Sequence, residues 1–199
     1  FGLLLAIALV SPYVVMLLTA VKPESELRIT PPRLLPLRWH SASFLEVVTD
    51  RGFQAWFQVS LTVAGLSTAI VLLTATPAAY YTARHRFPGR AAFLVLVLIT
   101  QMFSPTALVV GLYRQFFELG LVNTRAALIL TNAAFNLAFA IWILRAFFAS
   151  IPREIEEAAA VDGCSRVRVL FQVVLPLSLP ALVTAAIFAF IAAWNEFLF

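Results

Sequence analysis

The chain has 199 residues, of which 62% are hydrophobic and only 12% are charged, whereas soluble domains average about 45–50% apolar and about 25% charged residues. A globule of this size cannot bury so much apolar surface, so the composition excludes an ordinary soluble domain and indicates a protein that has lipid as its solvent. The net charge of +4 is modest, and no basic run interleaves with aromatic residues, so the charge does not indicate a nucleic-acid-binding protein.

Five stretches without charged residues are long enough to cross a bilayer as helices. About 20 residues at 1.5 Å per residue cover the roughly 30 Å hydrocarbon core, and the alternating pattern of a membrane β-barrel is absent. We therefore predict an all-α, polytopic membrane protein. In chain order the predicted spans are residues 1–21, 52–83 (with the membrane core near 60–83), 91–113, 126–144 and 169–195, the last beginning near Pro176.

The connections between these spans differ in length and charge. Residues 22–51 are rich in proline and carry both signs, so an ordered but irregular connection is predicted. Residues 84–90 contain three arginines, and residues 114–125 are short and mixed in charge. Lysine and arginine number seven in the first and third connections and seven in the second and fourth, so the count leaves the orientation open. The density of arginine favours a cytoplasmic second connection.

The fourth connection, residues 145–168, carries the strongest pattern in the chain. Pro152 suits the first turn of a helix, and the glutamates that follow it suit the positive end of a helix dipole. Gly163 can adopt the left-handed conformation that ends a helix. Ser165 can cap a second short helix, which is expected to end before Pro176. The segment is therefore predicted to form a helix, a glycine turn and a second helix.

One face of the first of these helices is predicted to be shallow. Ile155, Ala158, Ala159 and Asp162 share that face by their spacing of three and four residues, and the alanines leave room for another protein to pack closely. A helix lying on the membrane surface is the competing interpretation. The acidic first turn disfavours it, because anionic headgroups repel glutamate.

A resemblance decides between these interpretations. Glu157-Ala158-Ala159, three residues, Gly163, nine residues and then Val173-Val174-Leu175-Pro176 resemble the E-A-A-x3-G-x9-I-x-L-P loop of ABC importer permeases, and only Val173 departs from that pattern. The chain resembles the carbohydrate-uptake, maltose-permease-like permeases in particular, over nearly its whole length. That similarity is carried by Ala79-Tyr80 with Arg84, Phe87-Pro88-Gly89-Arg90, Gln101-Met102, Leu119-Gly120-Leu121 with Asn123-Thr124, Ile141-Trp142 and Trp194-Asn195-Glu196-Phe197.

The resemblance implies a type I ABC importer transmembrane domain, in which residues 150–176 form a cytoplasmic coupling loop that docks into a groove of an ATPase subunit. It implies that Glu157 is a polar anchor to the ATPase, that Ala158 and Ala159 form the close-packed face, and that Gly163 is the turn. The residues expected to couple to the ATPase are Glu156, Glu157, Ala158, Ala159, Asp162, Gly163, Leu175 and Pro176.

Location and partners also follow from the resemblance. It implies the bacterial cytoplasmic (inner) membrane, with residues 22–56 outside, where family members meet a substrate-binding protein. The implied partners are a second permease, two cytoplasmic ATPase subunits, an extracytoplasmic binding protein, membrane lipid and a sugar, oligosaccharide or glycerol derivative. No cofactor is expected in this chain, because it has no G-x-x-x-x-G-K-[ST] loop; ATP and magnesium are expected in the ATPase.

Such permeases usually have six spans, so residues 1–199 are expected to form one permease domain that is truncated at both ends and lacks the sixth span. The first stretch, residues 1–21, is interpreted as a span and not as a signal peptide, because no basic segment precedes it and no A-x-A site follows it.

A few polar residues within the spans are candidates for a substrate pathway. Asn132 and Asn136 share one face of the fourth span, where amides can contact sugar hydroxyls, although hydrogen bonding between helices is the commoner role. Gln101 and Ser104, with Pro105, can unwind the third span or line a cavity, although packing is the commoner role. The predicted pathway residues are Gln101, Asn132, Asn136, Asn195 and Glu196.

Three other functions fit the sequence less well. An ion-driven secondary transporter needs buried carboxylates or paired half-repeats, and only Glu196 lies near a span. A membrane-embedded enzyme needs clustered His, Asp or Cys, whereas Cys164, His40 and His85 are scattered, so no catalytic or metal-binding residue is predicted. An ABC importer permease for a solute other than a sugar stays open as an alternative.

Overall fold

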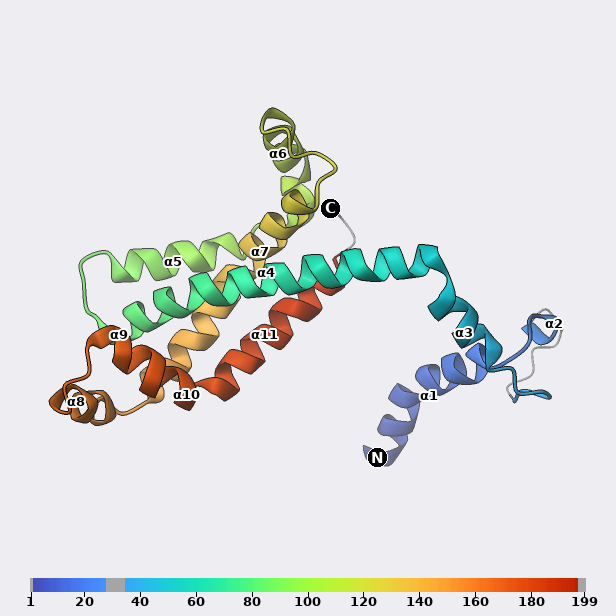
Figure 1. Cartoon of the computed structure of the whole chain (residues 1–199), viewed down its shortest axis with the longest axis horizontal. Helices are drawn as coiled ribbons and strands as arrows, with labels where there is room; N and C mark the ends of the chain where they lie inside the picture. Colours follow the sequence, from blue (N-terminus) through green and yellow to red (C-terminus); the bar gives the residue numbers. More distant parts are fainter. Residues whose placement is uncertain (1, 28–34, 197–199) are drawn as a thin grey trace. The chain divides into compact units, whose positions relative to one another are not determined.

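The computed structural model describes residues 2–27 and 35–196, and within these residues every regular element is a helix (Figure 1). The predicted all-α fold is therefore confirmed. The chain forms two compact units, residues 1–58 and residues 59–199. Helix α4 (Arg51–Arg84) begins in the first unit and continues into the second.

The first unit contains three helices before α4. They are α1 (Gly2–Ala20), α2 (Glu24–Leu27) and α3 (Ala42–Thr49). Helix α1 coincides with the first predicted span, and the side chains of its apolar residues are largely exposed, as lipid-facing residues are.

The connection after α1 is ordered where the structure describes it. The carboxylate of Glu26 accepts hydrogen bonds from the backbone N–H groups of Leu37 and Arg38, at 3.0 and 3.2 Å. The N–H of His40 donates to the carbonyl oxygen of Val21 at 2.8 Å, which joins the two ends of the connection. The connection also holds α2 and α3, so it is more helical than the irregular segment predicted from its prolines.

Helices α4, α7 (Arg125–Ser150) and α11 (Leu179–Trp194) supply most of the core of the second unit. Helices α7 and α11 pack against each other along their length. Alanine lies at every fourth position of the buried face of α11, and small side chains allow helices in a membrane to approach closely. These buried residues are Ala181, Ala185, Ala189 and Ala193.

The third predicted span is broken. Helices α5 (Arg90–Thr100) and α6 (Pro105–Glu118) meet at 97° across residues 101–104. Pro105 explains the break, because proline disfavours helical backbone in the residue before it, and Ser104 is extended with ψ 131°. The span is therefore unwound between Gln101 and Pro105, one of the roles that the sequence left open for this segment.

The fifth predicted span is also bent, by 76° at Ser178. Before the bend lie α9 (Arg166–Val169), a π-helical turn (Leu170–Val174) and α10 (Leu175–Leu177), and α11 follows it. Helix α9 ends at Val169, before Pro176 as expected, but helical backbone continues through the π turn and α10 as far as Leu177. In a regular α-helix the ring of Pro176 would clash with the carbonyl four residues earlier, and the wider π turn relieves that clash. The bend comes where Pro180 occupies the first turn of α11.

The number of membrane crossings depends on how the two bent helix pairs are counted. Among the described helices, α4 and α7 alone are continuous and apolar enough to cross a membrane by length and composition, and each of the two bent pairs adds one if it is counted as a single span. Helix α1 is a shorter apolar helix. The predicted spans therefore coincide with apolar segments, but two of them are discontinuous.

A candidate coupling helix and a polar cavity

Helix α8 (Arg153–Val161) forms the first part of the predicted coupling loop, and Gly163 ends it as predicted. Gly163 has φ +86°, a left-handed conformation. Its N–H donates to the carbonyl of Ala160 at 3.1 Å, and the N–H of Cys164 donates to the carbonyl of Ala159 at 3.0 Å. This pair of bonds is the Schellman motif, which satisfies carbonyls at a helix end. Pro152 lies just before α8 and not in its first turn, which is a correction of one residue.

A second short helix follows the glycine turn. The hydroxyl of Ser165 accepts a hydrogen bond from the N–H of Arg168 at 3.4 Å, so Ser165 caps α9 as predicted. The order of helix, glycine turn and helix is therefore confirmed. Leu175 and Pro176 lie in α10, where Leu175 is half-buried and Pro176 is exposed.

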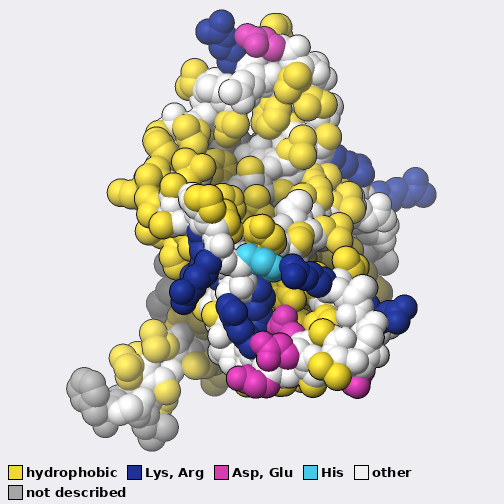
Figure 2. Space-filling view, turned by 90° about the vertical axis from the view of Figure 1, so that its left-hand side faces the viewer, with side chains coloured by type: hydrophobic (Ala, Val, Ile, Leu, Met, Phe, Trp, Pro, Cys, Tyr) yellow, Lys and Arg dark blue, Asp and Glu magenta, His cyan; other side chains and the backbone are white. Residues whose placement is uncertain are grey.

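The two faces of α8 differ in exposure. Glu157, Ala158 and Asp162 are exposed, and so is Gly163 in the turn. Ala159 is half-buried against the core. Charged side chains of both signs gather at this end of the molecule, next to a largely hydrophobic flank (Figure 2). Helix α8 therefore exposes acidic and small side chains together with the apolar side chain of Val161.

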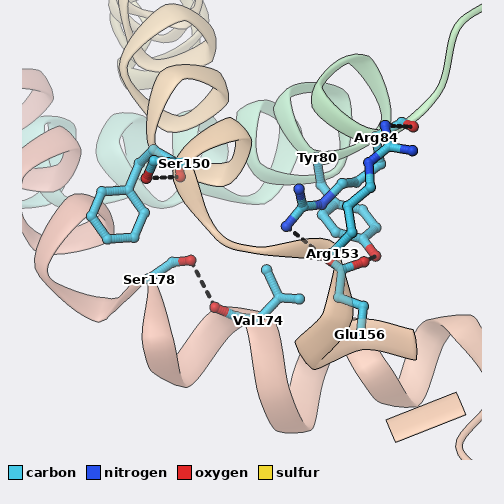
Figure 3. Close-up of polar contacts among 8 residues, drawn as sticks. Tyr80, Arg84, Ser150, Arg153, Glu156, Val174 and Ser178 are labelled. Carbon is cyan, nitrogen blue, oxygen red and sulfur yellow. Dashed lines mark hydrogen bonds and ion pairs between the residues drawn. The ribbon is translucent and has the colours of Figure 1, made fainter. Parts of the chain in front are cut away.

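Glu156 differs from its neighbour Glu157, because its side chain points back toward α4 (Figure 3). The hydroxyl of Tyr80 donates to Oε2 of Glu156 at 2.7 Å. Nη2 of Arg84 lies 2.5 Å from Oε1 of the same carboxylate. The resemblance included Tyr80 and Arg84 but implied no role for either. The opposite charges of Arg84, at the end of the second predicted span, and of Glu156, in the fourth connection, are a signal for their pairing that the sequence contains.

A polar cavity of about 240 Å³ forms where the break between α5 and α6 lies against α7 and α11. It brings together four of the five predicted pathway residues: Gln101, Asn132, Asn136 and Glu196. Thr100, Phe103, Pro105, Phe135 and Ala192 complete its lining. Asn195, the fifth predicted residue, is not part of this lining, and its amide donates to the carbonyl of Ile191 at 2.9 Å.

Hydrogen bonds hold the amides of this cavity in place. Nε2 of Gln101 donates to the carbonyl of Phe135 at 3.0 Å, which joins the broken span to α7. Nδ2 of Asn132 donates to the carbonyl of Leu128 at 3.0 Å, and Nδ2 of Asn136 donates to the carbonyl of Asn132 at 2.8 Å. The amide N–H groups of both asparagines thus bond within α7 and not to a neighbouring helix, the commoner role considered for them.

Comparison with known proteins identifies the family. Residues 41–199 match the family described as the binding-protein-dependent transport system inner membrane component. The chain belongs to this family. Its two continuous apolar helices and its membership together make it a multi-pass inner membrane protein.

Two curated relatives are permeases of sugar transport systems. The sulfoquinovosyl glycerol transport system permease protein SmoH of Agrobacterium fabrum is 38% identical over 187 residues, which are 94% of this chain and 66% of that protein. The trehalose/maltose transport system permease protein MalG of Thermococcus litoralis is 34% identical over 200 residues, with 100% of this chain and 71% of that protein covered. The chain thus spans 66% of the length of SmoH.

A solved structure shares the fold of this family member. The crystal structure of a bacterial ABC transporter involved in the import of the acidic polysaccharide alginate has a TM-score of 0.83 and 24% sequence identity, and the match covers 97% of this chain and 68% of that one. The fold of this chain is therefore also found in a solved bacterial ABC transporter.

Proposed function

We propose that this chain is a permease subunit of an ABC importer for a carbohydrate. In this proposal it pairs with a second permease, and two cytoplasmic ATPase subunits supply the energy from ATP. An extracytoplasmic binding protein delivers the sugar. The chain itself performs no chemistry, and its spans switch between inward-open and outward-open cavities.

The geometry of α8 is the observation that carries this proposal. A short helix bounded by Pro152 and by the left-handed Gly163 presents the exposed residues Glu157, Ala158 and Asp162 to a partner. The exposed Ala158 next to a charged anchor suits docking into a groove, since small side chains let two backbones come close, whereas Ala159 packs against the core of this chain and not toward a partner. In the proposed orientation residues 150–176 are cytoplasmic and residues 22–56 are extracytoplasmic.

The substrate class rests on the relatives and on the polar cavity. SmoH and MalG are named for transport systems of a sugar glycoside and of disaccharides. Amide and carboxylate side chains of Gln101, Asn136 and Glu196 line a cavity that also contains aromatic rings. Amides both donate and accept hydrogen bonds, so such a lining suits a ligand rich in hydroxyl groups.

Co-purification tests the proposed coupling. The full-length protein, tagged and expressed together with its proposed partner subunits, is expected to co-purify with an ATPase subunit. Glu157→Lys reverses the charge of the exposed anchor and is expected to lose that ATPase and the uptake that depends on it. Glu118→Lys makes the same change on the exposed surface of α6 and is expected to leave both unchanged. An ATPase that stays bound to Glu157→Lys with normal uptake contradicts the assignment of the coupling helix.

A further inference from the structure

A buried ion pair ties the candidate coupling helix to the end of α4. The side chains of Arg84 and Glu156 are only 8% and 16% exposed. The hydroxyl of Tyr80 donates to the second oxygen of the same carboxylate, so both oxygens of Glu156 are engaged (Figure 3). Removal of one partner of a buried ion pair is destabilising, because it leaves the other charge buried without a counter-charge.

A second contact joins the same two helices. Nη2 of Arg153, the first residue of α8, donates to the backbone carbonyl of Arg84, the last residue of α4, at 3.1 Å (Figure 3). Carbonyls at a helix end have no partner within the helix, and a cation there also complements the helix dipole. We call the contacts among Tyr80, Arg84, Arg153 and Glu156 the α4 brace.

The segment after the glycine turn reaches α4 as well. Nη1 of Arg166, at the start of α9, lies 3.3 Å from Nε2 of His85, and the ring of His85 stacks on Tyr81 with centroids 4.5 Å apart. Contacts to the end of α4 therefore come from both sides of Gly163.

The backbone on both sides of α8 is not helical, so its position is set by these contacts together with its packing on α9, on the π turn and on the core. Pro152 has ψ 138° and Gly163 has φ +86°, so α8 continues neither α7 nor α9. A helix of nine residues between two such ends has no continuous helical connection to either neighbour. The α4 brace holds the side chain of Glu156 against α4, while the adjacent Glu157 borders the same pocket and stays exposed.

We propose that Glu156 is a positioning residue that makes α8 and the adjoining end of α4 move as one body when the ATPase subunits act on α8. This proposal rests on the proposed function. It separates the roles of the two adjacent glutamates, since Glu157 contacts the partner while Glu156 passes the movement to α4. Because α4 is 34 residues long and continuous, its inner end can carry that movement into the transmembrane core.

Distance measurements between spin labels in the assembled transporter test the proposal without knowledge of the sugar. Labels are placed at Val161 of α8, which is 88% exposed, and at Leu73 of α4, which is 75% exposed, in a Cys164→Ser background. With the α4 brace intact, the distribution of distances between the two labels is expected to be narrow and the same in the nucleotide-free and the ATP–vanadate states. In Glu156→Gln it is expected to broaden or to shift with nucleotide.

Three further variants exclude a merely structural effect. The exchanged pair Arg84→Glu with Glu156→Arg is expected to recover the narrow distribution that Glu156→Gln loses. Tyr80→Phe removes one hydroxyl but keeps the ring contact with Phe148. If Glu156→Gln assembles poorly, the label distances are measured in Tyr80→Phe instead, and the same broadening is expected. Glu118→Gln breaks the ion pair with Arg114, whose side chains are 82% and 64% exposed, and is expected to behave as wild type.

The same variants have a functional consequence. Glu156→Gln is expected to lower the amount of sugar imported per ATP hydrolysed about tenfold, while ATP hydrolysis itself persists. Maltose, trehalose and sulfoquinovosyl glycerol are the uptake probes. If Glu156→Gln only impaired folding or assembly, the rates of sugar import and of ATP hydrolysis would both fall in proportion to the amount of assembled transporter.

Two results would overturn the proposal. One is a wild-type distance that shifts with nucleotide as much as that of Glu156→Gln; the other is a wild-type distribution in both Glu156→Gln and Tyr80→Phe. If no ATPase co-purifies with the wild-type chain, the proposed function has failed; if one does and either of these two results appears, only the role of Glu156 has failed.

Discussion

Glu156 and Glu157 are neighbours in the chain, yet their side chains lie in different environments. Glu156 bonds to Tyr80 and Arg84, whereas Glu157 is exposed. A helix turns by about 100° per residue, so one step along α8 separates an inward position from an outward one. Charge and helix propensity are the same for the two residues, and only the position of α4 distinguishes them.

Gly163 shows what a single backbone conformation contributes. An L-amino acid with a left-handed φ costs about 1–2 kcal/mol, so Gly163→Ala is expected to destabilise the chain by that amount. A Cβ at this position would meet nothing within 4 Å, so the cost comes from the backbone and not from a clash. Thermal unfolding of the purified chain in detergent measures the change.

Gly111 is the matched control for this substitution. It lies within α6, has no left-handed φ and likewise has open space around an added Cβ. Alanine favours a helix more than glycine does, so Gly111→Ala is expected to be neutral or to stabilise by up to about 1 kcal/mol. Equal effects of the two substitutions would contradict the importance of the turn.

At the scale of elements, proline decides where the apolar segments break. Pro105 and Pro180 each lie in the first turn of a helix that follows a bend. Pro12 and Pro77 lie inside helices that continue, and the π turn precedes Pro176. Proline alone does not predict a break, because tertiary packing and π turns can satisfy the carbonyls that it leaves unpaired.

The contact between α7 and α11 depends on small side chains. Ala185 is only 1% exposed on the buried face of α11, so a leucine there has no space. Ala185→Leu is expected to destabilise the chain by about 1–3 kcal/mol, as overpacking does. Ala134→Leu adds the same atoms at an exposed position of α7 and is expected to change stability by less than about 0.5 kcal/mol. Unfolding in detergent that does not distinguish the two variants would refute this role for the alanine face.

At the scale of the whole second unit, the polar cavity exists because the third span is broken. The break at residues 101–104 brings Gln101 to Asn132, Asn136 and Glu196, which come from α7 and from the end of α11. In a continuous third span Gln101 would be an ordinary residue within a helix, and no break would lie there to form the cavity. Polar groups thus gather at the break in an apolar segment, and discontinuous helices form the substrate sites of many transporters.

The cavity predicts a specific effect on sugar affinity. Gln101→Leu removes an exposed amide from the lining and is expected to raise the KM for uptake about tenfold, the value of one lost hydrogen bond of about 1.4 kcal/mol. ATP hydrolysis in the absence of sugar is expected to stay unchanged. Asn195→Leu, outside the lining, serves as the control and is expected to leave the KM unchanged. A larger effect at Asn195 than at Gln101 would show that the pathway lies elsewhere.

The sequence by itself determined the helical membrane fold, the family and the order of helix, glycine turn and helix around Gly163. These are local properties, set by apolar length, by backbone conformation and by a motif of fixed spacing. Only the tertiary structure decided which glutamate faces α4 and which four of the five polar residues meet in one cavity. Those outcomes depend on contacts between residues far apart in the chain, 76 positions for Tyr80 with Glu156 and 34 for Gln101 with Phe135. Local patterns cannot specify such pairs, because each depends on how several helices pack together.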